Sequence, residues 1–196
     1  MNIARILYPV KVLGPGNRIG IWVCGCRRGC KGCSNPELWD RKPEYEATID
    51  EVMELIGRIA QQHPADGFTI SGGEPMDQAQ ALAQLLPRLK AYSNDILIYS
   101  GYRIEELRNR KNTATDDAAT DEVLSQAAVL IDGEYREEEN TDVLLRGSAN
   151  QRIHILNPDL TEKYREYLAG ARNQIQNFTT SNGVVSVGIH RSGFNG

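Results

Sequence analysis

Several common features are missing from this 196-residue sequence, and each absence excludes a class of protein. No stretch approaches the roughly 20 consecutive apolar residues of a membrane span, and the N-terminus, MNIARILYPV, lacks the features of a signal peptide. Basic residues are not in excess, since 22 Lys and Arg stand against 26 Asp and Glu, so nucleic acid is a poor choice of partner. We therefore expect a cytoplasmic protein that binds neither membrane nor nucleic acid.

Cysteine is absent from all of the chain except one short stretch. The four cysteines lie within ten positions, in CGCRRGCKGC from Cys24 to Cys33. In a reducing compartment, clustered cysteines are more often metal ligands or redox groups than disulfides. Bridges between such close neighbours would also close only small loops and gain little chain entropy. The stretch is therefore expected to bind a metal.

Hydrophobic periodicity predicts alternating strands and helices over most of the chain. The strand-like runs are 2–10, 18–25, 67–75, 95–102, 127–135 and 151–156. A capping box of Thr48 and Glu51 introduces a helix at about 49–61, and a helix at about 78–91 has to kink or stop early at Pro87. Shorter helices are predicted at 103–109 and 121–126. The alternation is typical of parallel βαβ units.

The last third of the chain has a different pattern. Residues 134–150 are acidic, polar and without period, which predicts a long loop. A helix over 159–176 follows by composition, and a Ser-Asn-Gly turn between β-rich runs predicts a hairpin over 177–190. We expect one domain overall, with residues 1–156 as its core and residues 157–196 as a C-terminal extension packed on it.

Glycines follow the predicted strands, at Gly25, Gly72, Gly73, Gly101 and Gly133. In parallel α/β folds, ligands bind at the carboxyl ends of the strands. The cysteine loop belongs to the same edge. The sequence thus predicts one site, built from several strand ends around a metal that the cysteines hold.

The cysteine spacing leaves two metals open. A structural zinc site usually gathers two C-x2-C pairs a dozen or more residues apart, and no second pair exists here. Zinc held by all four cysteines, in a binding module without catalysis, remains an alternative. From Cys26 onward the spacing is C-x3-C-x2-C, and three such cysteines can hold three irons of a [4Fe-4S] cluster, leaving the fourth iron without a protein ligand.

Two motifs together carry a family resemblance. CRRGCKGC resembles the cluster motif of the radical S-adenosylmethionine enzymes, and SGGEP at 71–75 resembles their Gly-Gly-Glu motif on the next strand end. Within that superfamily the chain is similar to the activases of anaerobic ribonucleoside-triphosphate reductase. The further matching stretches are GPGNRIGIWVCGC, CSNPELWD, IYSGY, VLIDGEY and RGSANQR, in order over most of residues 12–156.

The resemblance implies a fold, a reaction and a set of site residues. The fold would be a partial, open parallel (β/α) barrel. Cys26, Cys30 and Cys33 would hold the [4Fe-4S] cluster, whose open iron binds S-adenosylmethionine. Reductive cleavage would give a 5′-deoxyadenosyl radical, which takes a hydrogen atom from a glycine of the reductase. The residues implied to bind S-adenosylmethionine are Gly72, Gly73 and Glu74 at one turn, together with Ser100 and Asp132.

Three features stand apart from the resemblance. Cys24 lies outside the three-cysteine motif and is read as a small packed residue at a strand end. The basic residues Arg27, Arg28 and Lys31 suit an acidic electron donor such as reduced flavodoxin. The unmatched tail after residue 156 favours an alternative, a radical S-adenosylmethionine enzyme that modifies another peptide or a small molecule.

Overall fold

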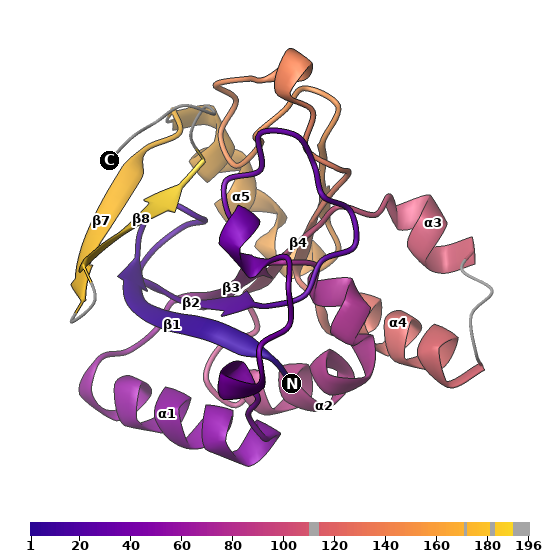
Figure 1. The fold of residues 1–196 in the computed structure, drawn as a ribbon. Helices are drawn as coiled ribbons and strands as arrows, with labels where there is room; N and C mark the ends of the chain where they lie inside the picture. The colour runs from indigo at the N-terminus through magenta and orange to yellow at the C-terminus, as the bar shows by residue number, and fades with distance from the viewer. Residues whose placement is uncertain (110–113, 171, 181–182, 190–196) are drawn as a thin grey trace.

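The computed structural model describes residues 1–109, 114–170, 172–180 and 183–189, and shows a six-stranded sheet, flanking helices and a separate hairpin (Figure 1). The sheet runs in chain order through β1 (Ile3–Val10), β2 (Arg18–Val23), β3 (Gly67–Gly72), β4 (Ile96–Ser100), β5 (Val129–Asp132) and β6 (Arg152–Ile155). The helices are α1 (Ile49–Gln62), α2 (Ala79–Leu89), α3 (Ile104–Asn109), α4 (Ala114–Gln126) and α5 (Thr161–Gly170). The hairpin pairs β7 (Ile175–Thr180) with β8 (Gly183–Gly188).

The expected parallel sheet is confirmed for its four central strands, β2 to β5. The two outer strands, β1 and β6, run antiparallel to their neighbours. The seven residues between β1 and β2 are too few for a parallel crossover, which needs a dozen or more. The loop after β5 stays at the carboxyl edge, so β6 starts there, with Arg152 opposite Asp132.

The two faces of the sheet have different cover. Side chains of α1, α2 and α4 pack on one face and make the largest apolar cluster, with Ile56, Leu86 and Val123 among its buried members. On the other face, Trp22 packs with Val187 of β8, and Leu97 packs with Tyr164 of α5. Figure 1 shows α1 and α2 below the sheet and the hairpin on its other side. The second face is the one that carries the candidate site.

A buried ion pair joins α5 to the sheet. Arg18 is fully buried, and its guanidinium donates to the Asp95 carboxylate at 3.0 Å. Lys163 and Tyr164 of α5 contact the same carboxylate at 2.7 and 2.6 Å. Burial favours a higher pKa for Asp95, but the charge and hydrogen bonds of Arg18 outweigh it, so the pKa is lowered.

Most of the predicted elements are confirmed, with three differences. Pro87 does not stop α2, which continues to Leu89, and α4 begins at Ala114 rather than at 121. The helix predicted over 159–176 is wrong at its end, because α5 finishes at Gly170 and Ile175 already pairs in β7. Helical composition there is overridden by pairing with β8. Residues 181–182 of the predicted Ser-Asn-Gly turn lie outside the described residues.

The helices in the described part of the chain fall short of the length and apolar character that a membrane crossing requires.

Candidate functional site

The loop after β2 carries the four cysteines and is closed by the 3-10 turn η1 (Pro36–Leu38). The Gly25 N–H donates to the Leu38 carbonyl at 2.9 Å, and the Cys26 N–H donates to the Trp39 carbonyl at 2.8 Å. These bonds tie the start of the loop to its end. The thiols between them are therefore held at the carboxyl end of β2.

Cys24 is set apart from the other three cysteines. It is fully buried and packs in an apolar cluster with Trp22 and Leu38. Its N–H donates to the Asn2 carbonyl at 2.9 Å, and its carbonyl accepts from the Gln78 amide at 2.9 Å. Burial raises the pKa of its thiol, which keeps the sulfur protonated and unreactive.

Cys26, Cys30 and Cys33 line one cavity. Burial raises the pKa of the Cys26 and Cys30 thiols, while backbone N–H groups, from Arg28 and Gly29 at Cys26, act in the opposite direction. The Asn35 N–H donates to the Cys33 sulfur at 3.4 Å. Such donors favour the thiolate, the form in which cysteine binds metal.

The arrangement of these thiols distinguishes the two metals. Among the described residues, no group of three or more Cys, His, Asp or Glu side chains is gathered as a single metal ion requires. The burial of Cys24 in an apolar cluster, away from the cavity that the other three cysteines line, disfavours zinc held by all four cysteines. In a [4Fe-4S] cluster each thiolate binds a different iron, so three thiols along one cavity wall suit that group.

The turn after β3 brings Gly72 and Gly73 against the cysteine loop. Gly72 has φ +107°, and a Cβ there would lie 2.4 Å from the Val23 carbonyl oxygen. A Cβ on Gly73 would lie 2.5 Å from the Gly25 carbonyl oxygen. Both glycines line the cavity. Their lack of a side chain is therefore required for the close approach of two strand ends, whatever the cavity holds.

Glu74 is buried behind this turn and ties it to the end of β4. Its carboxylate accepts from the Ser100 hydroxyl at 2.9 Å, from the Gly101 N–H at 2.7 Å and from the Met76 N–H at 2.9 Å. Burial raises the pKa of Glu74 to about 7 despite these donors. Glu74 and Ser100 line the cavity and also organise its wall.

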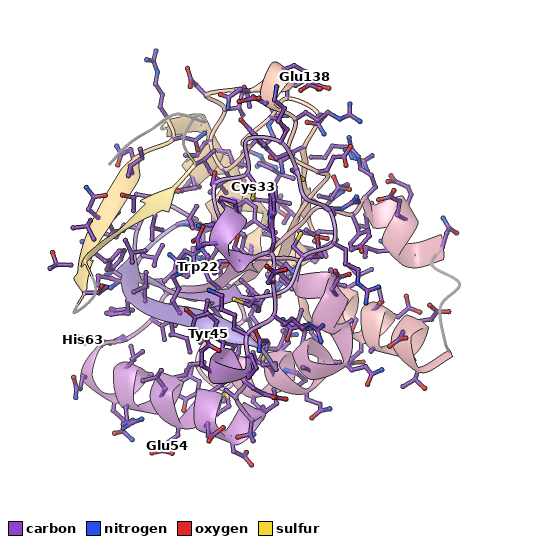
Figure 2. All side chains as sticks on the ribbon, viewed as in Figure 1. Trp22, Cys33, Tyr45, Glu54, His63 and Glu138 are labelled. Atoms are coloured by element: carbon purple, nitrogen blue, oxygen red, sulfur yellow. The ribbon has the colours of Figure 1, made fainter. Side chains whose placement is uncertain are left out.

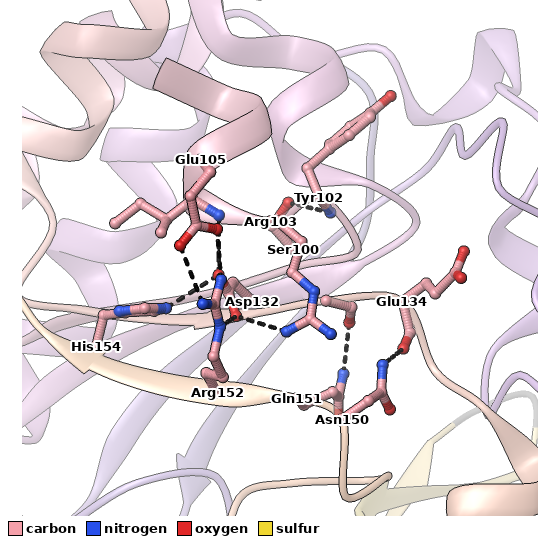
Figure 3. A network of polar contacts seen from close by, with 12 residues as sticks. Ser100, Tyr102, Arg103, Glu105, Asp132, Glu134, Asn150, Gln151, Arg152 and His154 are labelled. Atoms are coloured by element: carbon pink, nitrogen blue, oxygen red, sulfur yellow. Dashed lines mark hydrogen bonds and ion pairs between the residues drawn. The ribbon is translucent and has the colours of Figure 1, made fainter. Parts of the chain in front are cut away.

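Asp132 takes part in a polar network at the end of β5 (Figure 3). Its carboxylate contacts Arg152 at 2.8 Å, His154 at 2.9 Å and the Ile104 N–H at 2.8 Å. Burial favours a higher pKa, but the hydrogen bonds from Arg152 and Ile104 outweigh it and lower the pKa of Asp132. Asp132 is not among the cavity-lining residues, although its neighbour Gly133 is.

The cavity has further walls. Gly147 and Gln151 of the RGSANQR stretch line it from the loop after β5, and Trp22 and Tyr99, which the sequence analysis did not single out, line it from the sheet. Figure 2 shows Cys33 and Trp22 on the opposite side of the sheet from Glu54 of α1. Strand alternation was an available signal for the two aromatics, because their sheet neighbours Ile21 and Ile98 face the helices.

The C-terminal hairpin also lines this cavity, through Ser186, Val187 and Gly188 of β8 and the following Ile189. Nothing in the sequence placed it there, since residues 157–196 matched no motif. Periodicity predicts that a hairpin exists but not where it packs.

Comparison with known proteins finds relatives over most of the chain. A family model described as "4Fe-4S single cluster domain" matches residues 12–154. The chain is 32% identical, over 158 residues, to the "anaerobic ribonucleoside-triphosphate reductase-activating protein" of Enterobacteria phage T4, covering 78% of this chain and 93% of that protein. Proteins of the same name from Vibrio cholerae and Escherichia coli K12 are 33% and 31% identical, covering 75% and 76% of this chain and 94% and 96% of theirs.

Proposed function

This chain belongs to the family of anaerobic ribonucleoside-triphosphate reductase-activating proteins, and on that basis we propose that it is a radical S-adenosylmethionine enzyme that generates a glycyl radical on such a reductase. The observation that carries the proposal is that Cys26, Cys30 and Cys33 line the same cavity as the glycine turn after β3.

In the proposed mechanism, Cys26, Cys30 and Cys33 would hold a [4Fe-4S] cluster. The bound and reduced group would supply the one electron that cleavage of S-adenosylmethionine into methionine and a 5′-deoxyadenosyl radical requires, and that radical would take a hydrogen atom from a glycine of the reductase. The chain's own residues hold the thiolates in place, through the N–H donors and the bonds that close the loop.

The turn of Gly72 and Gly73 is proposed to receive the methionyl end of S-adenosylmethionine, with Glu74 and Ser100 fixing that turn. Support comes from the hydrogen bonds that join Glu74, which follows β3, to Ser100 and Gly101 at the end of β4. Asp132 is proposed to act on cofactor binding through its neighbour, because its carboxylate is already engaged by Arg152 and the start of α3. These contacts of the Asp132 side chain would fix the backbone of the next residue, Gly133, which lines the cavity.

Anaerobic reconstitution with iron and sulfide tests the proposed cofactors. Cys26→Ala, Cys30→Ala and Cys33→Ala should each lose the cluster absorbance and the formation of 5′-deoxyadenosine on reduction with S-adenosylmethionine. Cys24→Ala is the matched control and should retain both, because its sulfur packs among apolar side chains. A colourless wild-type protein with tightly bound zinc would refute the proposal, and loss of the cluster in Cys24→Ala but not Cys26→Ala would refute the ligand assignment.

The substrate is tested separately. The reduced enzyme is mixed with the anaerobic reductase of the same organism, and a glycyl radical is sought by electron paramagnetic resonance. A second candidate is the modification of another peptide or a small molecule, which is favoured by the hairpin that lines the cavity from outside the family match. Active cleavage of S-adenosylmethionine without a glycyl radical on the reductase would favour that candidate.

Four further features complete the proposal. The sheet would be an incomplete barrel, open at its outer strands, with residues 1–156 as the catalytic core and 157–196 as an extension. A reduced flavodoxin or similar acidic protein would supply the electron near the exposed Arg27, whereas Arg28 and Lys31 already contact Glu106 and Glu137. The protein would reside in the cytoplasm, where a reducing environment keeps clustered cysteines available as metal ligands.

A further inference from the structure

The C-terminal hairpin lies outside the region that the family model matches, yet it forms part of the cavity wall. The model match ends at residue 154, and β7 and β8 begin at 175 and 183. Ser186 and Val187 of β8 line the same cavity as the three cysteines. Figure 1 shows the hairpin beside the sheet, on the side away from α1 and α2. The extension thus contributes directly to the candidate site.

The hairpin is fastened to the body of the protein on the β7 side. The Gln176 side chain donates to the Pro9 carbonyl at 2.7 Å and accepts from the Lys11 N–H at 2.9 Å. On the other strand of the hairpin, β8, Val187 is 3% exposed and packs with Trp22 of β2. These contacts fix the position of β8 before any ligand binds, so it is a preformed wall.

One edge of β8 is left outside the hairpin ladder. In the described part of the chain, β7 is the one strand that pairs with β8. Thr180 and Gly183 are the last pair of the ladder, and two residues join them along the chain. With so short a connection, the N–H and C=O groups of this pair bond directly to each other. Directly bonded and non-bonded pairs alternate along antiparallel strands. The residues of β8 whose N–H and C=O groups point away from β7 are therefore Val184, Ser186 and Gly188.

The three outward-pointing residues differ in what they face. Ser186 lines the cavity, and so do the next three residues, Val187 to Ile189. Because successive side chains of a strand point to opposite faces, four consecutive lining residues mean that the strand presents its edge rather than one face. Val184 is 65% exposed and does not line the cavity. The backbone of Ser186 and Gly188 is thus the part of the free edge that borders the site.

We propose that the free edge of β8 at Ser186 docks the glycine-bearing segment of the reductase as an added, extended strand. This inference rests on the proposed function and names how its substrate is held. A segment whose reacting residue is glycine offers no side chain there, so it has to be recognised through its backbone. Strand addition provides main-chain hydrogen bonds of that kind, from groups repeating every second residue. A nucleoside could use one such donor, but it would not use the backbone groups of two alternate residues, Ser186 and Gly188, as an added strand does.

Proline at position 186 tests the proposal. Ser186→Pro removes the outward N–H but spares the bonds to β7, since proline is tolerated at such edge positions. Ser186→Ala is the matched control, because it loses the same hydroxyl and the 2.8 Å bond to Asn177 but keeps the N–H. Val184→Pro is a second control, because it removes an outward N–H from the same edge of β8 at a residue that does not line the cavity. The readouts are 5′-deoxyadenosine formed without reductase, and the reductase concentration that gives half the maximal glycyl radical.

The expected result is specific to one variant. Ser186→Pro should form 5′-deoxyadenosine as the wild type does, while needing at least roughly tenfold more reductase, since a hydrogen bond is lost and the proline ring obstructs the added strand. Ser186→Ala and Val184→Pro should stay within about twofold. Equal behaviour of Ser186→Pro and Ser186→Ala would refute docking, and a higher radical yield in Ser186→Pro would show that the hairpin shields the cavity instead.

Hydrogen exchange on the unmodified protein provides a test that does not depend on whether the proline variant folds. Adding reductase should slow exchange of the Ser186 amide, with the Val185 amide, which faces β7, as the internal reference. Unchanged exchange at Ser186 while the glycyl radical forms would overturn the proposal. A wild type that yields no 5′-deoxyadenosine or no glycyl radical would instead refute the proposed function, so the two failures are distinguishable.

Discussion

The pH dependence of stability should reveal the buried carboxyl of Glu74. Its folded pKa of about 7 lies above its ordinary value of 4.5, because burial outweighs three hydrogen-bond donors. A carboxyl with a raised pKa binds its proton more tightly in the folded state. Its contribution to stability is therefore fully present below about pH 4.5 and is lost as the pH rises to about 7.

The magnitude follows from the size of the pKa difference. At about 1.4 kcal/mol per pH unit, the interval from 4.5 to about 7 corresponds to roughly 3 kcal/mol. Glu74→Gln has no titrating group at this position, so subtracting its free energy of unfolding from that of the wild type isolates Glu74. The difference, wild type minus variant, should fall by roughly 3 kcal/mol between pH 4.5 and 7.5.

Urea unfolding of the cluster-free, reduced proteins provides the assay. Both proteins carry the same other titrating groups, which cancel in the difference. Ser100→Ala sharpens the test, because the Ser100 hydroxyl donates to the Glu74 carboxylate at 2.9 Å and its loss should raise the Glu74 pKa further. A difference that is constant with pH, or that grows as the pH rises, would show that the donors outweigh burial and that the reasoning is wrong.

Three other substitutions test the packing around the site and the scaffold. Gly73→Ala should prevent cluster assembly, measured as iron bound after reconstitution, because its Cβ would lie 2.5 Å from the Gly25 carbonyl oxygen. Asp95→Ala should lower the free energy of unfolding by about 3–5 kcal/mol, since it leaves the charge of the fully buried Arg18 unpaired. Thr48→Ala should cost about 1 kcal/mol in urea unfolding through loss of the capping box that starts α1.

The first two of these tests have a contrasting substitution in the chain. Gly170→Ala adds a Cβ that meets no atom within 4 Å and should leave cluster assembly unchanged. Asp50→Ala breaks an exposed ion pair with Arg88 and should cost less than about 1 kcal/mol. A loss in Asp95→Ala as small as that in Asp50→Ala would refute the assignment of Arg18 as a buried charge that depends on its partner.

Local patterns predicted most of the elements because the signals for them are themselves local. Thr48 and Glu51 form the capping box that their spacing predicted, with the Glu51 N–H donating to the Thr48 hydroxyl at 3.2 Å. Four of the five glycines predicted to converge, Gly72, Gly73, Gly101 and Gly133, line one cavity, whereas Gly25 does not line it but lies against Gly73. The end of the helix predicted over 159–176 was wrong, because pairing of Ile175 with Gly188 is a contact that helix propensity does not contain.

The sequence by itself determined the cysteine spacing, the order of strands and helices and the family, because these depend on residue identity and on positions close along the chain. Only the tertiary structure decided which groups meet. It packed Cys24 against Trp22 and Leu38, engaged Asp132 with Arg152 rather than with the cavity, and placed Ser186 of the extension against the cavity. These outcomes depend on contacts between distant segments, whose packing and burial no local pattern specifies.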